Sequence, residues 1–358
     1  MNIYLFLIWL IFLMLFFSKI NNKKIIMFLV LIGMFISLAT QKNIGTDYYA
    51  YIEIFRFGDN RVEKGYLIFN KIIKYISSND RALFIGVAIL QTLLLYNLLL
   101  KQNKIKMYNN FLLYFIILCM STNFYTGMFN TLRSTIAVLS FNIALIYYLK
   151  KKYIRSFIFI FFGGSFHTSI YIVVILILLL KKLLLKEYNR IFLLMLLICC
   201  FIVNKLDILR KILEIIYYSN IDFVYKHYFI SYHLFAYRKG LGIATLINFI
   251  IYILVFISHI KIKKEKILFY NLGILTIILT VLFSGMPVLN RILEYFNPFY
   301  AFVIYCFINY YITKNRTFFI SFIILLFYLL QLIVGVQRTL NYNVTNDKIQ
   351  LIKKELNL

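Results

Sequence analysis

The sequence is poor in the residues that interrupt a chain and in those that keep it soluble. Only 2 of the 358 residues are proline and 13 are glycine, which excludes low-complexity and collagen-like chains. Charged residues make up 15% and hydrophobic residues 63%, whereas soluble domains are about a quarter charged and about half apolar. Too little polar surface is present to cover a globule in water. The composition therefore predicts an all-α, polytopic integral membrane protein.

Acidic residues are scarce, with 13 Asp and Glu against 39 Lys and Arg and a net charge of +26. Such an excess can indicate nucleic-acid binding, but here much of it lies in short clusters between apolar runs, as in cytoplasmic loops. We therefore expect no nucleic-acid partner. Lysines outnumber arginines 28 to 11, so an arginine is the stronger indication of function.

Cysteine is rare as well, and its four copies lie inside apolar runs. Buried thiols of this kind behave as small hydrophobes, so neither a disulfide nor a metal site is predicted. The sequence has no HExxH motif, and His227 and His233 alone are weak evidence for a metal site. No cofactor is expected. The first apolar run lacks the basic region and cleavage site of a signal peptide, and is expected to be a first span.

Apolar runs long enough to cross a bilayer recur along the chain, since a helix needs about 17–20 residues to do so. Candidate spans are 3–18, 25–40, 82–100, 111–126, 132–149, 191–204, 241–258, 267–285, 299–312 and 317–335. Residues 156–180 form either one long helix or two short ones broken at Gly163 and Gly164. The spans predict a single integral membrane domain over residues 1–358.

Basic clusters decide the topology. Six of them hold 20 of the 39 basic residues, and they lie at 19–24, 101–106, 150–155, 181–190, 261–266 and 314–316. All six face the cytoplasm, as the positive-inside rule requires, only if 156–180 forms a hairpin. This gives about 11–12 segments with both termini outside. The main outer loops are then 41–81 and 205–240, and we expect any chemistry on the extracytoplasmic face.

Two of the carboxylates in the first outer loop are each followed closely by tyrosine. Asp47 and Glu63 are candidate acid/base or hydroxyl-binding groups, and Tyr48 and Tyr66 are candidates to stack on sugar faces. The alternative is that Asp47 only caps a short interfacial helix while the tyrosines form an aromatic belt.

Asn130 and Arg133 lie at the start of a span. An arginine is poorly placed beside the positive end of a helix dipole, but an anionic ligand reverses that cost because helix N-termini and guanidinium groups both bind phosphate. The alternative for Arg133 is snorkelling to the lipid headgroups. A lysine would snorkel equally well, so phosphate binding is favoured.

His167 follows Gly163-Gly164 between two apolar runs. A polar break at membrane depth must line protein or water. His167 is therefore a candidate general base or phosphate ligand, and the alternative is a hydrogen-bonded interior histidine.

Two further outer segments carry candidates. Arg291, Glu294 and Tyr295 share one face if they are helical, and a second outer arginine suggests a pyrophosphate clamp; a local Arg291–Glu294 pair is the alternative. The segment 205–240 begins with an amphipathic pattern that suits the membrane interface. Its second half is aromatic and includes Arg238, which suits a carbohydrate or lipid headgroup, or else forms an amphipathic lid.

Five motifs in this order resemble the EpsG/Wzy-type family of extracellular and O-antigen polysaccharide polymerases. They are Gly45-Thr46-Asp47-Tyr48, Glu63-x-Gly65-Tyr66, Asn130-x-x-Arg133-x-x-x-Ala137, Phe166-His167-x-Ser169 and Arg291-x-x-x-Tyr295. Together they span most of the chain. Ser134 departs from the glutamine expected in the family, and no match is seen for the 205–240 loop, as expected if that loop reads the sugar repeat.

The resemblance implies a GT-C-like glycosyltransferase in the bacterial cytoplasmic (inner) membrane, which joins glycan repeats carried on undecaprenyl diphosphate into O-antigen, capsule or exopolysaccharide. Arg133 and Arg291 would stabilise the diphosphate leaving group, and a carboxylate or His167 would deprotonate the acceptor hydroxyl. Implied partners are the undecaprenyl-diphosphate-linked oligosaccharide, the lipid bilayer, a chain-length regulator and a flippase.

Three alternative functions remain at this point. An O-antigen ligase shares the chemistry and differs in its acceptor. A lipid-linked oligosaccharide flippase or transporter would need a charged cavity through the membrane, yet no acidic residue lies in the middle of a span. A membrane O-acyltransferase would use a histidine but not paired outer arginines.

Overall fold

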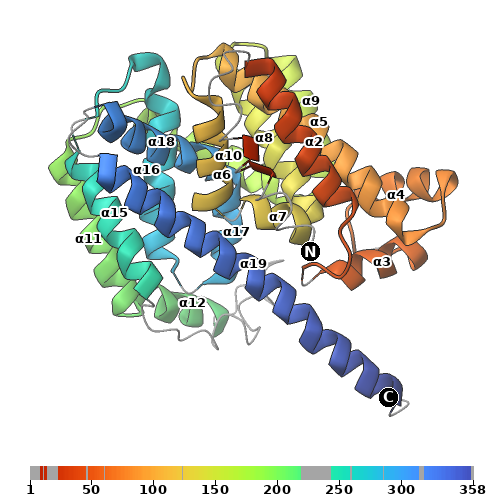
Figure 1. Ribbon diagram of the computed structural model, residues 1–358. Coiled ribbons are helices and arrows are strands. Elements are labelled where there is room, and N and C mark those ends of the chain that lie inside the picture. The colour runs from red at the N-terminus through yellow and green to blue at the C-terminus, as the bar shows by residue number, and fades with distance from the viewer. Residues whose placement is uncertain are drawn as a thin grey trace. The chain divides into compact units, whose positions relative to one another are not determined.

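The computed structural model describes residues 9–10, 12–13, 23–45, 47–59, 61–122, 124–218, 243–258, 260–284, 286–313 and 318–355. Every regular element in these ranges is a helix (Figure 1), which confirms the predicted all-α class. Contacts between the helices divide the chain into two compact units. The first is Met1–Ile175 with Leu326–Leu358, and the second is Leu176–Leu325.

The first unit is built around α8 (Leu132–Leu149), which packs against α5 and α9 and is buried over most of its length. The other helices of this unit are α2 (Lys23–Ala39), α3 (Tyr48–Phe57), α4 (Lys64–Ile76), α5 (Asp80–Lys104), α6 (Phe111–Ser121), α7 (Phe124–Asn130), α9 (Tyr153–Phe166), the start of α10 (Ser169–Leu184) and most of α19 (Phe318–Glu355). Ser140 and Asn142 of α8 donate to the carbonyls of Ile136 and Val138 at 2.8 Å. These bonds satisfy the Ser140 hydroxyl and the Asn142 amide N–H in an apolar interior.

Helices α8 and α9 form a tight antiparallel pair. A Cβ atom on Gly163 would lie 2.9 Å from Cβ of Ser140, so the close approach requires glycine. The predicted break at Gly163 and Gly164 is wrong in position, because α9 continues through both and ends at Phe166. The chain leaves the helix at His167, which is extended with φ −156° and ψ 115°. Residues 156–180 are nevertheless two helices, as the basic clusters predicted.

The second unit contains the rest of α10, α11 (Arg190–Lys205), α12 (Ile208–Tyr218), α15 (Ile243–Ile257), η1 (Lys264–Lys266), α16 (Ile267–Leu282), α17 (Pro287–Leu293), η2 (Glu294–Phe296), α18 (Asn297–Thr313) and the start of α19. Side-chain amides close two of its helix ends. Asn204 donates to the carbonyls of Leu282 and Ser284, both at 2.9 Å, and Asn271 donates to that of Leu184 at 2.8 Å. Carbonyls at a helix end have no partner within the helix, so these bonds satisfy groups that the helix itself leaves without a donor.

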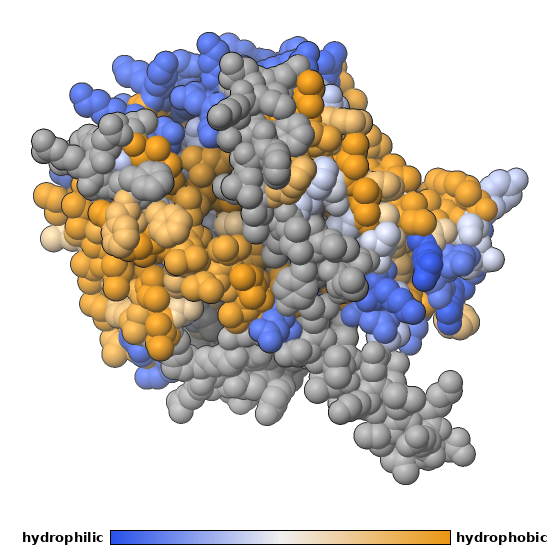
Figure 2. All heavy atoms as spheres, in the orientation of Figure 1, coloured by the Kyte–Doolittle hydropathy of each residue, from blue (hydrophilic) through white to orange (hydrophobic). Residues whose placement is uncertain are grey.

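Within the described residues, four helical stretches are long and apolar enough to cross a membrane: Asp80–Lys104, Leu132–Leu149, Lys264–Leu282 and Phe319–Gln337. A fifth is added if α6 and α7 count as one span bent by 61°. Helices α2, α9 and α15 are apolar but shorter. Hydrophobic side chains cover broad areas of the surface (Figure 2), as expected for helices that face lipid. The structure thus confirms a polytopic membrane protein, and the count of 11–12 segments stays a prediction.

The predicted span 111–126 is broken, and a side chain explains the break. The Thr122 hydroxyl donates to the carbonyl of Leu118 at 2.6 Å and accepts from the backbone N–H of Phe124 at 3.0 Å. Such side-chain bonds to the backbone compete with the helical pattern, and here they end α6 and start α7. Helix α7 then brings the chain to Asn130, directly before α8.

Candidate functional site

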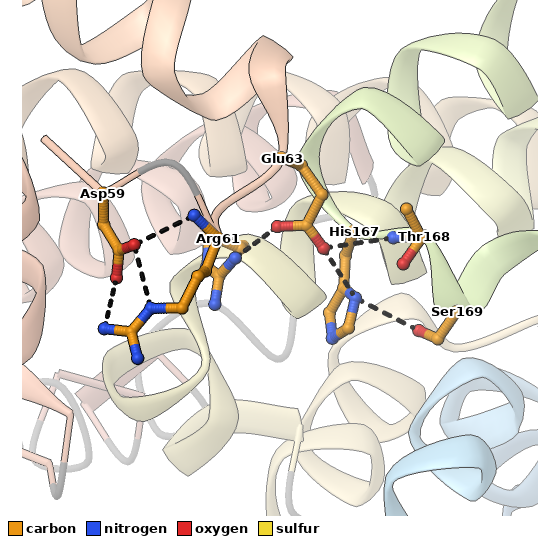
Figure 3. A network of polar contacts seen from close by, with 7 residues as sticks. Asp59, Arg61, Glu63, His167, Thr168 and Ser169 are labelled. Carbon is orange, nitrogen blue, oxygen red and sulfur yellow. Dashed lines mark hydrogen bonds and ion pairs between the residues drawn. The ribbon is translucent and has the colours of Figure 1, made fainter. Parts of the chain in front are cut away.

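Glu63 is the centre of a polar cluster that joins three parts of the first unit. It directly precedes α4, and its side chain is 15% exposed. One carboxylate oxygen accepts a hydrogen bond from Nη1 of Arg133, at the start of α8. The other lies 3.4 Å from Nδ1 of His167 and accepts from the backbone N–H of Thr168 at 3.3 Å (Figure 3). The first outer loop, the start of α8 and the α9–α10 turn therefore meet at one carboxylate.

The charges around Glu63 keep it ionised. Burial alone would raise the pKa of this carboxyl, but the hydrogen bond from His167 and the charge of Arg133 outweigh burial and lower the pKa to about 2. A carboxylate with so low a pKa is a weak base. It is better suited to orienting a neighbouring imidazole and guanidinium than to accepting a proton.

Arg133 lies between Glu63 and an aromatic ring. Its guanidinium carbon is 5.7 Å from the ring centre of Tyr66, in the range of a cation–π contact. The side chain is 26% exposed, and its Nε is buried without a hydrogen-bond partner among the described residues. Nη1 is bonded to Glu63 and the Tyr51 hydroxyl also interacts with the guanidinium, which has five N–H donors and so keeps some for a further acceptor such as a phosphate.

His167 is held by both its backbone and its ring. Its backbone N–H donates to the carbonyl of Gly163 at 2.9 Å, and Nδ1 lies 3.4 Å from both Glu63 and the Ser169 hydroxyl. The side chain is 27% exposed, and no described residue bonds Nε2. If Nδ1 carries the proton toward Glu63, Nε2 is the nitrogen that can accept one.

Gly65 makes this arrangement possible. A Cβ atom at Gly65 would lie 2.3 Å from Oγ and 2.7 Å from the backbone oxygen of Ser165. The first turn of α4 therefore packs against the last turn of α9 with no room for a side chain. This contact places Glu63 beside His167. The sequence has this glycine two residues after Glu63, but no local pattern in it indicates the role of Gly65 or of the Thr168 N–H.

Asp47 and Asn130 lie at the edge of the cluster. Asp47 occupies the N-cap position of α3 without a side-chain capping bond, so the capping alternative is not what the structure shows. Its backbone N–H donates to Oδ1 of Asn130 at 3.4 Å. Burial raises the pKa of Tyr51 to about 12; the charge of Asp47 adds to this rise and that of Arg133 opposes it. Asp47 is thus close enough to act on the same hydroxyl as Arg133.

The two candidate tyrosines are inside the protein. Tyr48 is 8% exposed and stacks on Phe84, with ring centres 4.7 Å apart. Tyr66 is fully buried among other aromatic rings, including that of Phe166 at 6.3 Å. Burial raises the pKa of both hydroxyls, which therefore stay neutral. Neither ring presents a face to solvent; Tyr66 instead faces Arg133.

The remaining predicted residues belong to the second unit or lie outside the described residues. Arg291 is exposed on α17, Glu294 begins η2, and Tyr295 is fully buried. The three do not share one continuous helical face, because α17 tightens into a 3₁₀ turn after Leu293. Arg238 lies outside the described residues.

Two surface ion pairs flank the cluster without joining it. Arg61 pairs with Asp59 at 3.1 Å (Figure 3), and Arg56 pairs with Asp80. Among the described residues, no three His, Cys, Asp or Glu side chains are grouped as ligands for a metal ion. The described cluster can orient an imidazole, bind an anion beside it, and move a proton at His167.

Comparison with known protein families gives a match over most of the chain. The EpsG family matches residues 24–347, a range that includes the Glu63 cluster and the Arg291 segment. The chain matches no curated protein and no solved structure.

Proposed function

Because the chain belongs to the EpsG family, which is linked to exopolysaccharide synthesis, we propose that it is a polysaccharide polymerase. Its substrates are glycan repeat units linked to undecaprenyl diphosphate. It acts on the extracytoplasmic face of the bacterial cytoplasmic membrane. The first outer loop is expected on that face, because the basic clusters of the sequence favour the cytoplasmic side.

The proposed reaction is a glycosyl transfer. The bond between the anomeric carbon of the growing chain and the carrier diphosphate breaks, and the diphosphate leaves with the electron pair. A bond forms between that carbon and a hydroxyl oxygen of the next lipid-linked repeat. The hydroxyl proton passes to a base of the protein. The site must therefore stabilise negative charge on the leaving group and accept one proton.

The contact of Glu63 with both Arg133 and His167 carries this proposal. The Glu63 carboxylate orients the imidazole through Nδ1, which leaves Nε2 to take the proton, in the way that a carboxylate orients a catalytic histidine in other enzymes. Asp47, which lies at the edge of the same cluster, is the alternative base.

Arg133 is the proposed diphosphate ligand in this unit. It stands at the first turn of α8, where the backbone N–H groups and the helix dipole also favour an anion. Its unpartnered Nε and its planar fork suit two phosphate oxygens at once. Arg291 is proposed to bind the diphosphate as well, because it is a second arginine on an outer segment.

The decisive experiment is the polymer ladder of a deletion strain that is complemented with wild-type protein or with a Glu63→Gln variant. A polymerase defect leaves the surface glycan with a single repeat unit and removes the long chains. A ligase defect instead leaves complete polymer on the lipid carrier. The proposal fails if the deletion strain keeps long chains or accumulates carrier-linked polymer.

A further inference from the structure

A groove that is separate from the Glu63 cluster lies in the same unit. The groove between α3 and α4 has a volume of about 390 Å³, within the usual range of about 300–1,000 Å³ for small-molecule sites. None of Glu63, Arg133 and His167 lines it. Its lining includes Arg56, Phe57 and Asp59 on one side, and Asn70, Lys71 and Lys74 on the other. It is a mixed groove, with apolar walls and a basic rim.

Two positive charges of this rim are not neutralised. Arg56 is paired with Asp80, and the one carboxylate of the groove, Asp59, is paired with Arg61. Lys71 contacts no acidic group among the described residues, and Lys74 donates only to the backbone carbonyl of Arg56, at 2.8 Å. Lysines are disfavoured in outer loops, so a pair of them without acidic partners points to an anionic ligand.

Asn70 supplies the second, independent observation. Its side chain lines the groove and is 4% exposed, yet neither Oδ1 nor Nδ2 has a hydrogen-bond partner among the described residues. The Tyr66 hydroxyl on the same helix is close enough to interact with Asn70, and it has no other partner among the described residues. An unsatisfied buried amide is unfavourable, and it offers one acceptor and two donors. Neighbouring hydroxyls of a sugar present the complementary groups.

We propose that this groove binds an acidic sugar of the glycan. The carboxylate lies between Lys71 and Lys74, the hydroxyls reach Asn70, and the exposed ring of Phe57 covers a sugar face. Figure 2 shows hydrophilic and hydrophobic surfaces side by side on the α3–α4 pair. Asn70 is seven residues beyond Glu63, about 10 Å along the helix, so the groove holds a sugar away from the reacting bond. The inference rests on the proposed function only for its choice of a glycan.

The test measures binding without turnover, using the full-length protein in phosphatidylcholine nanodiscs and saturation-transfer NMR. The probes are methyl glucuronide and its neutral counterpart methyl glucoside, which are observed directly, and inorganic phosphate, whose binding is measured by its displacement of methyl glucuronide. We expect methyl glucuronide to bind at least about fivefold more tightly than either other probe, and Lys71→Gln or Lys74→Gln to remove most of that preference. The matched control Lys64→Gln, on the same helix but outside the groove, leaves binding unchanged.

Asn70→Leu separates binding from folding. Because the amide has no partner, this variant should keep the thermal stability of the protein while weakening both glycosides at least about fivefold. The proposal is overturned if methyl glucuronide does not bind, if glucoside or phosphate binds equally well, or if Lys64→Gln has the effect of Lys71→Gln. The two proposals can fail separately. Glu63→Gln should lose the polymer ladder and still bind methyl glucuronide, because Glu63 does not line the groove.

Discussion

Oε1 of Glu63 lies 3.4 Å from Nδ1 of His167, although the two residues come from different loops of the first unit. The second oxygen of the same carboxylate binds Arg133. One acidic group therefore faces two groups that carry or can carry positive charge, and it stabilises both in place. Without the Glu63 carboxylate, the guanidinium of Arg133 would be a partly buried charge with no opposite charge to compensate for its loss of water.

The first prediction concerns acid stability. The pKa of Glu63 is about 2 against an ordinary 4.5, because burial, which acts in the opposite direction, is outweighed by His167 and Arg133. A depressed pKa contributes stability that is present above the ordinary value and is lost as the pH falls toward the depressed one, here about 3 kcal/mol at most. We expect circular-dichroism melting of Glu63→Gln to lie below wild type at pH 7, and the gap to close between pH 4.5 and 2.

The control for this measurement is Glu187→Gln, since Glu187 is exposed and makes no ion pair with a described residue. It should melt like the wild-type protein at both pH values. A gap for Glu63→Gln that stays constant or widens as the pH falls would show that the carboxylate is not stabilised by the two cations.

Much of the cluster could be predicted one residue at a time, but not as a cluster. The sequence predicts Arg133 because an arginine is poorly placed at a helix start unless an anion binds there, and His167 because a polar break at membrane depth must line protein or water. It predicts Glu63 because that residue is a carboxylate of the first outer loop, followed closely by tyrosine. Their mutual contact depends on how closely α4 approaches α9, a tertiary distance that no local pattern encodes. The bounds of α8 agree with the predicted 132–149, because a mostly apolar stretch of that length forms a helix in lipid and its Ser140 and Asn142 side chains bond back to the helix's own carbonyls.

The second prediction tests that approach of α4 to α9. Gly65→Ala would place a Cβ atom 2.3 Å from Oγ and 2.7 Å from the backbone oxygen of Ser165, so α4 must move. A displacement of about 1 Å at a catalytic group can cost about 100-fold in rate. We expect a shortened polymer ladder at normal protein abundance, measured by gel electrophoresis of the surface glycan.

Two companion variants make the result specific. Gly335→Ala is the same change in a helix where nothing lies within 4 Å, and it should leave the ladder intact. Adding Ser165→Gly to Gly65→Ala removes the side-chain part of the clash and should restore part of the chain length. Full-length polymer from Gly65→Ala alone would mean that the contact does not set the position of Glu63.

The third prediction concerns the two arginines proposed to bind diphosphate. Arg133→Lys and Arg291→Lys keep the charge but lose the planar fork that bonds two phosphate oxygens together. Each should remove most of the polymer while leaving protein abundance near normal. The matched control is Arg61→Lys, because Arg61 is exposed and its pair with Asp59 at the surface contributes little. Near-full chain length in both test variants would instead support the alternatives, which are snorkelling for Arg133 and a local pair with Glu294 for Arg291.

The last prediction concerns His167. As the base, His167 supplies a proton acceptor that neither glutamine nor alanine can replace, and loss of a general base lowers a rate by about 10²–10⁴-fold. His167→Gln and His167→Ala should both be present in the membrane at wild-type levels and yield only single-repeat product on the gel. Glutamine can still donate a hydrogen bond to Glu63, so this variant tests chemistry apart from packing.

A structural role for His167 gives a different pair of results. His167→Gln would then keep most of the polymer, because a hydrogen bond to Glu63 is retained. His167→Ala would lower protein abundance, because Glu63 would lose one of the groups that lower its pKa. An active and abundant His167→Ala protein would remove the imidazole from the mechanism altogether, and Asp47, whose backbone is tied to Asn130 at the edge of the same cluster, would become the base to test.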